Sequence, residues 1–142
     1  MNKIEDLLNK ILDAPVGQVV AVLEKFLNGD IKLEVIEQNV VSSDQFVRKV
    51  SITAQGFPVI NANVKFDSTV LPEFIMTDLL RKKRGIGKIL NVNNIKPTRK
   101  IITINQDEDT AFREYQIICN GIIWFTIIEE IRLGNLGSDN YS

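Results

Sequence analysis

The chain has 142 residues, of which 44% are hydrophobic and 25% charged, as expected for one folded domain with a substantial core. Its 17 basic and 18 acidic residues give a net charge of −1, so we expect neither nucleic acid nor an anionic membrane as a partner. Histidine is absent, and Cys119 is the only cysteine. These counts exclude histidine-based nucleophilic catalysis, an intrachain disulfide and a metal site built from several cysteines or histidines.

A single cysteine fits a reducing cytosol, and we expect a cytoplasmic protein. Glu5 and Asp6 interrupt the first apolar residues, so the N-terminus does not resemble a signal peptide. The longest apolar stretch, residues 117–128, is too short to span a bilayer. We expect residues 1–133 to form one domain and the small, polar residues 134–142 to form a flexible tail.

Two helices are expected before residue 30. Apolar residues recur at helical spacing in the first helix, which Pro15 ends, and the second ends at Asn28-Gly29. The residues expected to face the core are Ile4, Leu7, Leu8, Ile11 and Leu12 in the first helix and Val19, Val20, Leu23, Phe26 and Leu27 in the second.

Strand patterns follow the two helices, with Gln55-Gly56 and Asn120-Gly121 as hairpin turns. The predicted strands cover residues 31–37, 46–53, 58–66, 99–104, 112–119 and 122–133. One more helix is expected at residues 71–81, with Pro72 in its first turn and Phe74, Ile75 and Leu79 as apolar contacts. The order predicts an α+β fold with a single antiparallel β-sheet of about six strands, two N-terminal helices and one inserted helix.

Three charged residues fall on the apolar faces of predicted strands, because side chains alternate across a strand. Arg48 shares a face with Val50 and Ile52, Arg113 with Tyr115 and Ile117, and Glu129 with Ile127 and Ile131. Arg99, at the start of its strand, is less clearly placed. One interpretation is that Arg48 or Arg113 pairs with Glu129 or reaches water at a strand end. The other is a cavity lined by arginines that binds a small anion through their planar forks.

A basic segment, residues 81–88, follows the third predicted helix and contains Gly85, Ile86 and Gly87. The two glycines allow the close backbone approach that phosphate- or carboxylate-binding loops need, although the spacing is not that of a P-loop. The basic residues themselves are also compatible with a solvated helix C-terminus that the helix dipole favours.

Five segments in order resemble the chorismate pyruvate-lyase family, especially its short archaeal and cyanobacterial or plastid branch. The resemblance runs from about Gly17 to Leu133. The segments are GQVVAVLEKFLNGDIKLEVIEQ, FVRKVSITAQGFPVINANV, LPEFIMTDLLRKKRGIGKIL, PTRKI and FREYQIICNG. The resemblance implies a chorismate lyase-like fold, which is related to the effector-binding domain of GntR-type regulators. The chain departs from the family where Gly85 replaces a proline and where Ile122-Ile123 replaces Lys-Pro.

The resemblance implies a carbon–oxygen lyase that converts chorismate to 4-hydroxybenzoate and pyruvate without a metal or another cofactor. Arg48 then matches a strand arginine that binds the carboxylate of the aromatic acid, and the backbone of Ile86 contacts the ligand. Glu129 or Glu130 matches a carboxylate at the phenolic end, and the apolar face favours Glu129. Arg99 and Arg113 match further family arginines, which we also expect to bind substrate.

Such a reaction needs positioning and electrostatic stabilisation rather than a nucleophile, because aromatisation of the ring drives it. The alternative function is a non-catalytic domain of the same fold that binds a small aromatic or carboxylic acid. A third alternative is an interaction protein without a cavity, in which the inward charges are paired. The pattern does not predict an oligomeric state.

Overall fold

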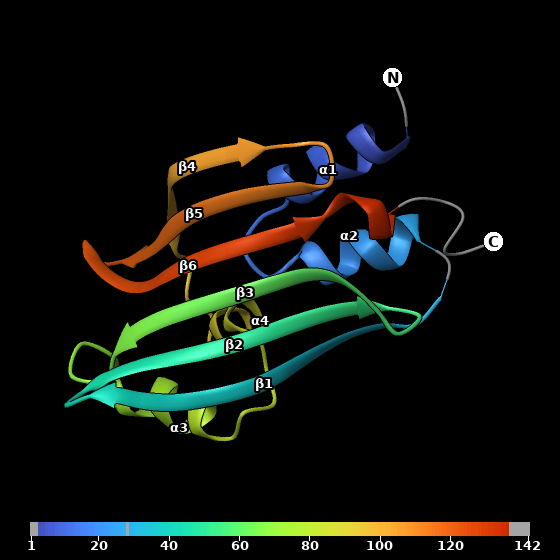
Figure 1. The fold of residues 1–142 in the computed structure, drawn as a ribbon. Helices are drawn as coiled ribbons and strands as arrows, with labels where there is room; N and C mark the ends of the chain where they lie inside the picture. Colours follow the sequence, from blue (N-terminus) through green and yellow to red (C-terminus); the bar gives the residue numbers. More distant parts are fainter. Residues whose placement is uncertain (1–2, 28, 137–142) are drawn as a thin grey trace.

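Six antiparallel strands form one sheet in the order β1-β2-β3-β6-β5-β4 (Figure 1). The structure is a computed structural model that describes residues 3–27 and 29–136. The strands are β1 (Ile31–Ser42), β2 (Gln45–Ala54), β3 (Phe57–Asp67), β4 (Thr98–Gln106), β5 (Thr110–Cys119) and β6 (Ile122–Arg132). The two halves of the sheet join where β3 pairs with β6, for example Ile60 with Ile131.

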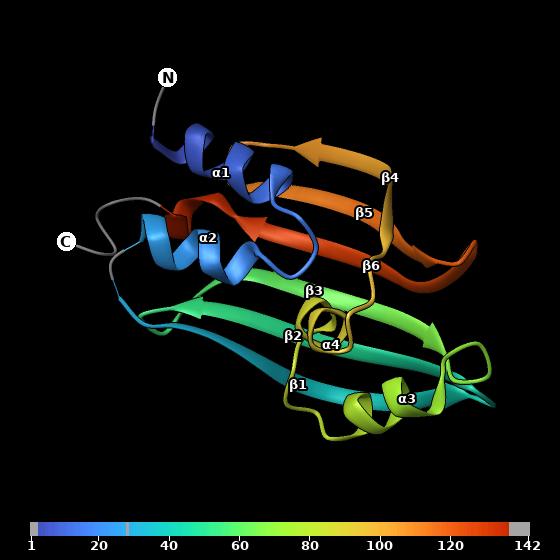
Figure 2. The same ribbon diagram turned by 180° about the vertical axis from the view of Figure 1, so that it is seen from behind.

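Four α-helices cover one face of this sheet, as Figure 2 shows from behind. They are α1 (Lys3–Asp13), α2 (Val19–Phe26), α3 (Glu73–Leu80) and α4 (Ile86–Val92), and a short 3-10 helix, η1 (Leu133–Leu136), follows β6. The predicted α+β class with a single antiparallel sheet of six strands is confirmed. None of the helices among the described residues has the length and apolarity that crossing a membrane requires.

The segment between β3 and β4 holds two helices, where the sequence predicts one. Helix α3 lies within the predicted residues 71–81, with Pro72 as its N-cap rather than in its first turn. Helix α4 was not predicted, because it has only seven residues and contains Gly87, which lowers intrinsic helix propensity. Its stability comes from tertiary packing, since Ile86, Ile89 and Leu90 are all buried.

Two predicted core residues are exposed instead. Phe26 is 43% exposed at the end of α2, where Lys10 and Lys25 lie over its ring at 5.0 and 5.6 Å. Phe74 is 54% exposed, because the first turn of α3 directs it away from the sheet while Ile75 and Leu79 are fully buried. Strand β1 also runs five residues further than predicted, to Ser42.

The apolar residues form two clusters under two pairs of helices. One cluster joins α1, α2 and η1 to the sheet through residues such as Leu8, Ile11 and Leu23. The other joins α3 and α4 to the sheet through residues such as Ile75, Ile89 and Phe125. The pairs of helices therefore pack over different parts of one sheet.

The packed part of the chain extends to Leu136, three residues beyond the predicted domain boundary. Leu136 is buried, and the Asn135 amide donates a hydrogen bond to the Pro58 carbonyl at 2.7 Å. The remainder of the predicted tail, residues 137–142, and Asn28 of the predicted helix stop lie outside the described residues.

Candidate functional site

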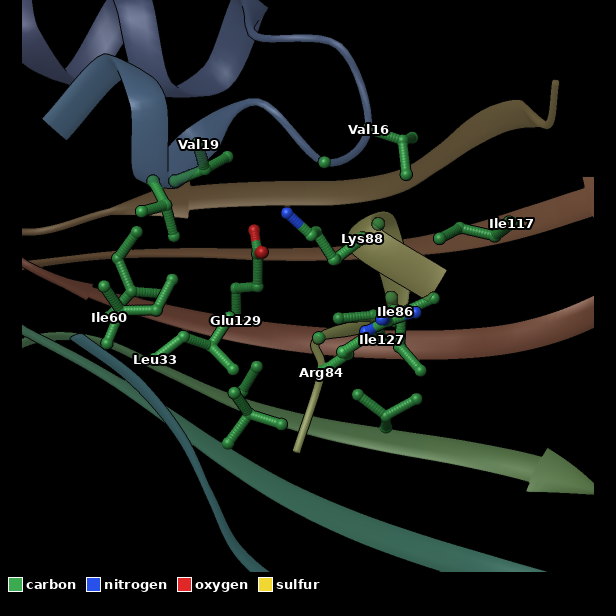
Figure 3. A pocket seen from close by; sticks show the side chains of 18 of the residues that line it. Val16, Val19, Leu33, Ile60, Arg84, Ile86, Lys88, Ile117, Ile127 and Glu129 are labelled. Carbon is green, nitrogen blue, oxygen red and sulfur yellow. The ribbon is translucent and has the colours of Figure 1, made fainter. Parts of the chain in front are cut away.

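A pocket of about 490 Å³ opens between the helices and the sheet. Its volume lies within the range of small-molecule sites, roughly 300–1,000 Å³. Apolar side chains from several strands form much of its lining, among them Leu33, Val50, Ile60 and Ile127. The loop between α1 and α2 and the start of α4 line it on the helical side (Figure 3).

Glu129 of β6 lies on the sheet side of this pocket and is 7% exposed. One carboxylate oxygen accepts a hydrogen bond from Nε of Arg113, and the other accepts one from the Tyr115 hydroxyl at 3.0 Å. Arg113 is directly opposite Glu129 in the β5–β6 register. These two hydrogen bonds fix the position of the carboxylate, and breaking such a buried pair would leave an uncompensated charge.

Arg99 of β4 joins this group from the neighbouring strand. Its Cζ lies 5.6 Å from the centre of the Tyr115 ring, and the Cζ of Arg113 lies 4.8 Å from the same ring. Both arginines donate to the Leu12 carbonyl at the end of α1, at 3.4 Å from Arg99 and 3.1 Å from Arg113. Burial, followed by the charge of Arg113, lowers the pKa of Arg99 from its usual value.

Tyr115 was not predicted as a site residue. Its position two residues after Arg113 in β5, on the same face, is the signal that could have identified it. Burial raises the pKa of the Tyr115 hydroxyl, and the neighbouring Glu129 charge raises it further. The hydroxyl is therefore a neutral hydrogen-bond donor at physiological pH.

The predicted pairing of Glu129 with an inward arginine is confirmed for Arg113, yet a pocket is also present. Glu129, Arg99, Arg113 and Ile86 are brought together in its lining. Glu130 is not among the lining residues: it alternates to the other face of β6 and lies 3.7 Å from an Arg132 nitrogen.

Arg48 is fully buried but does not line the pocket, contrary to the predicted convergence with Ile86 and Glu129. Its Nε donates to Gln38 at 2.7 Å, one terminal nitrogen donates to the Arg84 carbonyl at 2.6 Å, and the other donates to the Leu79 carbonyl at 2.9 Å. Burial lowers its pKa to about 10, and the Asp78 charge opposes this effect. Arg48 thus ties β2 to the end of α3 and to the segment that leads into the pocket lining.

Gly85, Ile86 and Gly87 line the pocket as the start of α4, with Gly85 as the N-cap. The glycines predicted a close approach of the backbone to a ligand, but the close contact of Gly87 is with another segment of the chain. A Cβ added at Gly87 would lie 2.2 Å from the Cα of Gly17, in the loop between α1 and α2. Gly17 has a φ of +88°, which favours glycine there as well. We call this contact the Gly17–Gly87 seam.

Charged residues from the helical side complete the pocket. Lys83, Arg84 and Lys88 line it near α4, and Glu24 lines it from α2. The sequence left the basic residues open between an anion-binding loop and a solvated helix end, and it gave no signal for Glu24. No group of three or more cysteine, aspartate or glutamate side chains is arranged to hold a metal ion within residues 3–27 and 29–136. The arrangement suits an apolar ligand with anionic ends and a hydrogen-bonding group for Glu129.

No known family model matches the chain. It is 32% identical over 108 residues to a Methanocaldococcus jannaschii protein named "Putative lyase MJ0807", a match that covers 71% of this chain. The chain spans only 58% of the length of that relative. Sequence similarity therefore connects the chain to a protein named as a lyase without defining its reaction.

Among solved structures, a "possible transcriptional regulator YydK" from Bacillus subtilis superposes with a TM-score of 0.52 at 10% identity. The match covers 76% of this chain and 60% of that protein. A GntR-family transcriptional regulator from Bacillus cereus has a TM-score of 0.48 at 15% identity, covering 73% of this chain and 92% of that one. At this level of identity, the Bacillus subtilis structure shows that the two chains share a fold.

Proposed function

We propose that the chain is a chorismate lyase-like enzyme, which eliminates pyruvate from chorismate to give 4-hydroxybenzoate. The observation that carries the proposal is Glu129, a carboxylate that two hydrogen bonds fix beside apolar strand residues, in a pocket that also contains unpaired positive charge. The similarity to a protein named as a lyase supports it. So does the family resemblance of the segments that contain Arg99 and Arg113.

The proposed reaction needs a dry, charged and well-ordered pocket more than it needs a strong nucleophile. The C–O bond between the ring and the ether oxygen breaks, so the oxygen leaves with the enolpyruvyl group. The neighbouring ring carbon, which bears the hydroxyl, loses a proton, and the ring becomes aromatic. The released enolpyruvate gains a proton and becomes pyruvate, so the atoms of substrate and products balance. Holding the ether in a reactive conformation and excluding water are the main contributions of the protein.

Glu129 is the proposed catalytic residue, and it accepts a hydrogen bond from the ring hydroxyl beside the leaving ether. Arg113 and Tyr115 are positioning residues that keep this carboxylate oriented. Arg99 has donors beyond its 3.4 Å contact with Leu12, and we propose that they bind a substrate carboxylate. Arg48 acts indirectly, by holding the segment before Ile86 against the sheet.

Incubation of the purified protein with chorismate, with 4-hydroxybenzoate followed by absorbance, tests this function. We expect turnover above the spontaneous rate and a loss of about 100-fold in kcat/KM for Glu129→Gln, because one fixed hydrogen-bonding charge has about this effect. Arg99→Gln should raise KM, whereas Lys100→Gln, at an exposed neighbouring position of β4, should change neither constant. Turnover at the spontaneous rate, or a fully active Glu129→Gln variant, would contradict the proposal.

The second candidate is a domain that binds an aromatic or carboxylic acid without converting it. The specific observation in its favour is that both oxygens of Glu129 already accept hydrogen bonds, and the shared fold with a possible transcriptional regulator adds to it. This alternative predicts that 4-hydroxybenzoate raises the Tm while chorismate yields no pyruvate. Pyruvate release measured with a coupled dehydrogenase separates the two candidates.

A further inference from the structure

Lys88 presents a positive charge to the pocket that nothing in the described part of the chain neutralises. The residue follows Gly87 in the first turn of α4 and is exposed, and it takes part in none of the ion pairs between described residues. Figure 3 shows its amine directed into the same part of the cavity as the Glu129 carboxylate. An ordinary surface lysine points to bulk water, whereas the Lys88 side chain points into the cavity and can contact a bound ligand.

Two of the other cations around the pocket are paired with carboxylates. Arg84 lies 3.2 Å from Asp78, and Arg113 pairs with Glu129. Five cationic and two acidic residues line the pocket, an excess of three positive charges, although the whole chain has a net charge of −1. Concave, apolar walls concentrate such a field on an anion inside the pocket.

The Gly17–Gly87 seam fixes the backbone position of Lys88 at the edge of the pocket. Because the backbone of Gly87 packs directly on that of Gly17, the first turn of α4 is held against the loop between α1 and α2. Four methylene groups then allow the ammonium to adapt to a ligand, as a flexible point charge does. Arg99, on β4, supplies a second cation from a different element of the lining.

We propose that Lys88 is a specificity-determining residue that binds a second carboxylate of the ligand, so that the pocket prefers dicarboxylates to monocarboxylates. The inference rests on the proposed function in one respect: if the ligand is chorismate, Lys88 binds the carboxylate of its enolpyruvyl group. Arg99 binds the carboxylate on the ring. The preference is a property of binding and is measurable whether or not the bound acid reacts.

Calorimetric titration with two probes that share one ring tests the inference. The dianion 3-(carboxymethoxy)benzoate should bind the wild-type protein about tenfold more tightly than the monoanion 3-methoxybenzoate. Lys88→Met should reduce this preference to about twofold or less and leave the affinity for the monoanion unchanged. Lys88→Arg should restore it, and Lys82→Met, at an exposed neighbour that does not line the pocket, should retain it.

Three results would overturn the inference: equal or undetectable binding of both probes by the wild type, an unchanged preference in Lys88→Met, or an equal loss of both affinities in that variant. The preference should also weaken as salt is raised from about 0.05 to 0.5 M, because the interaction is electrostatic. A normal preference in a protein that does not turn over chorismate would leave the role of Lys88 intact and contradict only the proposed reaction.

Discussion

At the scale of single residues, the pocket depends on charges that a sheet would ordinarily keep out of its core. The alternation of side chains correctly predicted that Arg48, Arg113 and Glu129 face inward. It left open which arginine pairs with Glu129, because the pairing of Arg113 with Glu129 requires the register of two strands. Besides Gln38, the partners of Arg48 are backbone carbonyl groups of a distant segment, and no residue pattern encodes such contacts.

Removing only Arg113 or only Glu129 should therefore lower the free energy of unfolding more than removing both residues. Arg113→Met leaves the Glu129 carboxylate buried without its partner, and we expect a loss of about 3–5 kcal/mol in the free energy of unfolding. The double variant Arg113→Met with Glu129→Leu should recover a large part of this loss. Urea denaturation measures both values, and a double variant less stable than Arg113→Met would contradict the account.

The Tyr115 hydroxyl should make stability depend on pH in the alkaline range. Its pKa is raised in the folded protein, so its contribution is fully present below about pH 10, the usual value for an unfolded chain, and is lost as pH rises further. The difference in Tm between the wild type and Tyr115→Phe, measured from pH 8 to 11, should stay constant below pH 10. Above it, the wild type should lose stability relative to the variant. A difference in Tm that stays constant from pH 8 to 11 would show that the pKa of Tyr115 is not raised in the folded protein.

At the scale of elements, the start of α4 is the part of the pocket that the sequence describes least well. The two glycines predicted close backbone approach to a ligand, whereas the backbone of Gly87 packs on Gly17, about 70 residues earlier in the chain. Local propensity disfavours a helix there, since Gly87 lies within it. The burial of Ile89 and Leu90 against the rest of the protein outweighs that preference.

Gly87→Ala tests the Gly17–Gly87 seam. Alanine would gain up to about 1 kcal/mol in helix propensity, but its Cβ would overlap the Gly17 backbone, and separating the two segments should cost more. We expect a net loss of about 1–2 kcal/mol, measured by urea denaturation. Gly134→Ala is the matched control, because a Cβ there meets nothing within 4 Å. Equal stability of Gly87→Ala and Gly134→Ala would show that the Gly17 and Gly87 backbones can separate without a loss of stability, contrary to this expectation.

At the scale of the whole molecule, one sheet supports two separately packed pairs of helices, and the pocket lies between them. The number of strands and the fold class follow from hydrophobic periodicity and hairpin turns. The order of the strands does not, because the pairing of β3 with β6 joins segments about 65 residues apart. The pocket lining comes from both halves of the sheet, so its composition becomes apparent only once this pairing is known.

We propose that this pocket, with Glu129 in its lining, holds an aromatic acid. A crystal structure of the protein with 4-hydroxybenzoate is the decisive measurement. We expect the ring among Leu33, Val50 and Ile127, with the phenolic oxygen within hydrogen-bonding distance of Glu129 and the Arg113 contact retained. A ligand bound elsewhere, or a pocket that stays empty at a saturating concentration of the acid, would contradict it.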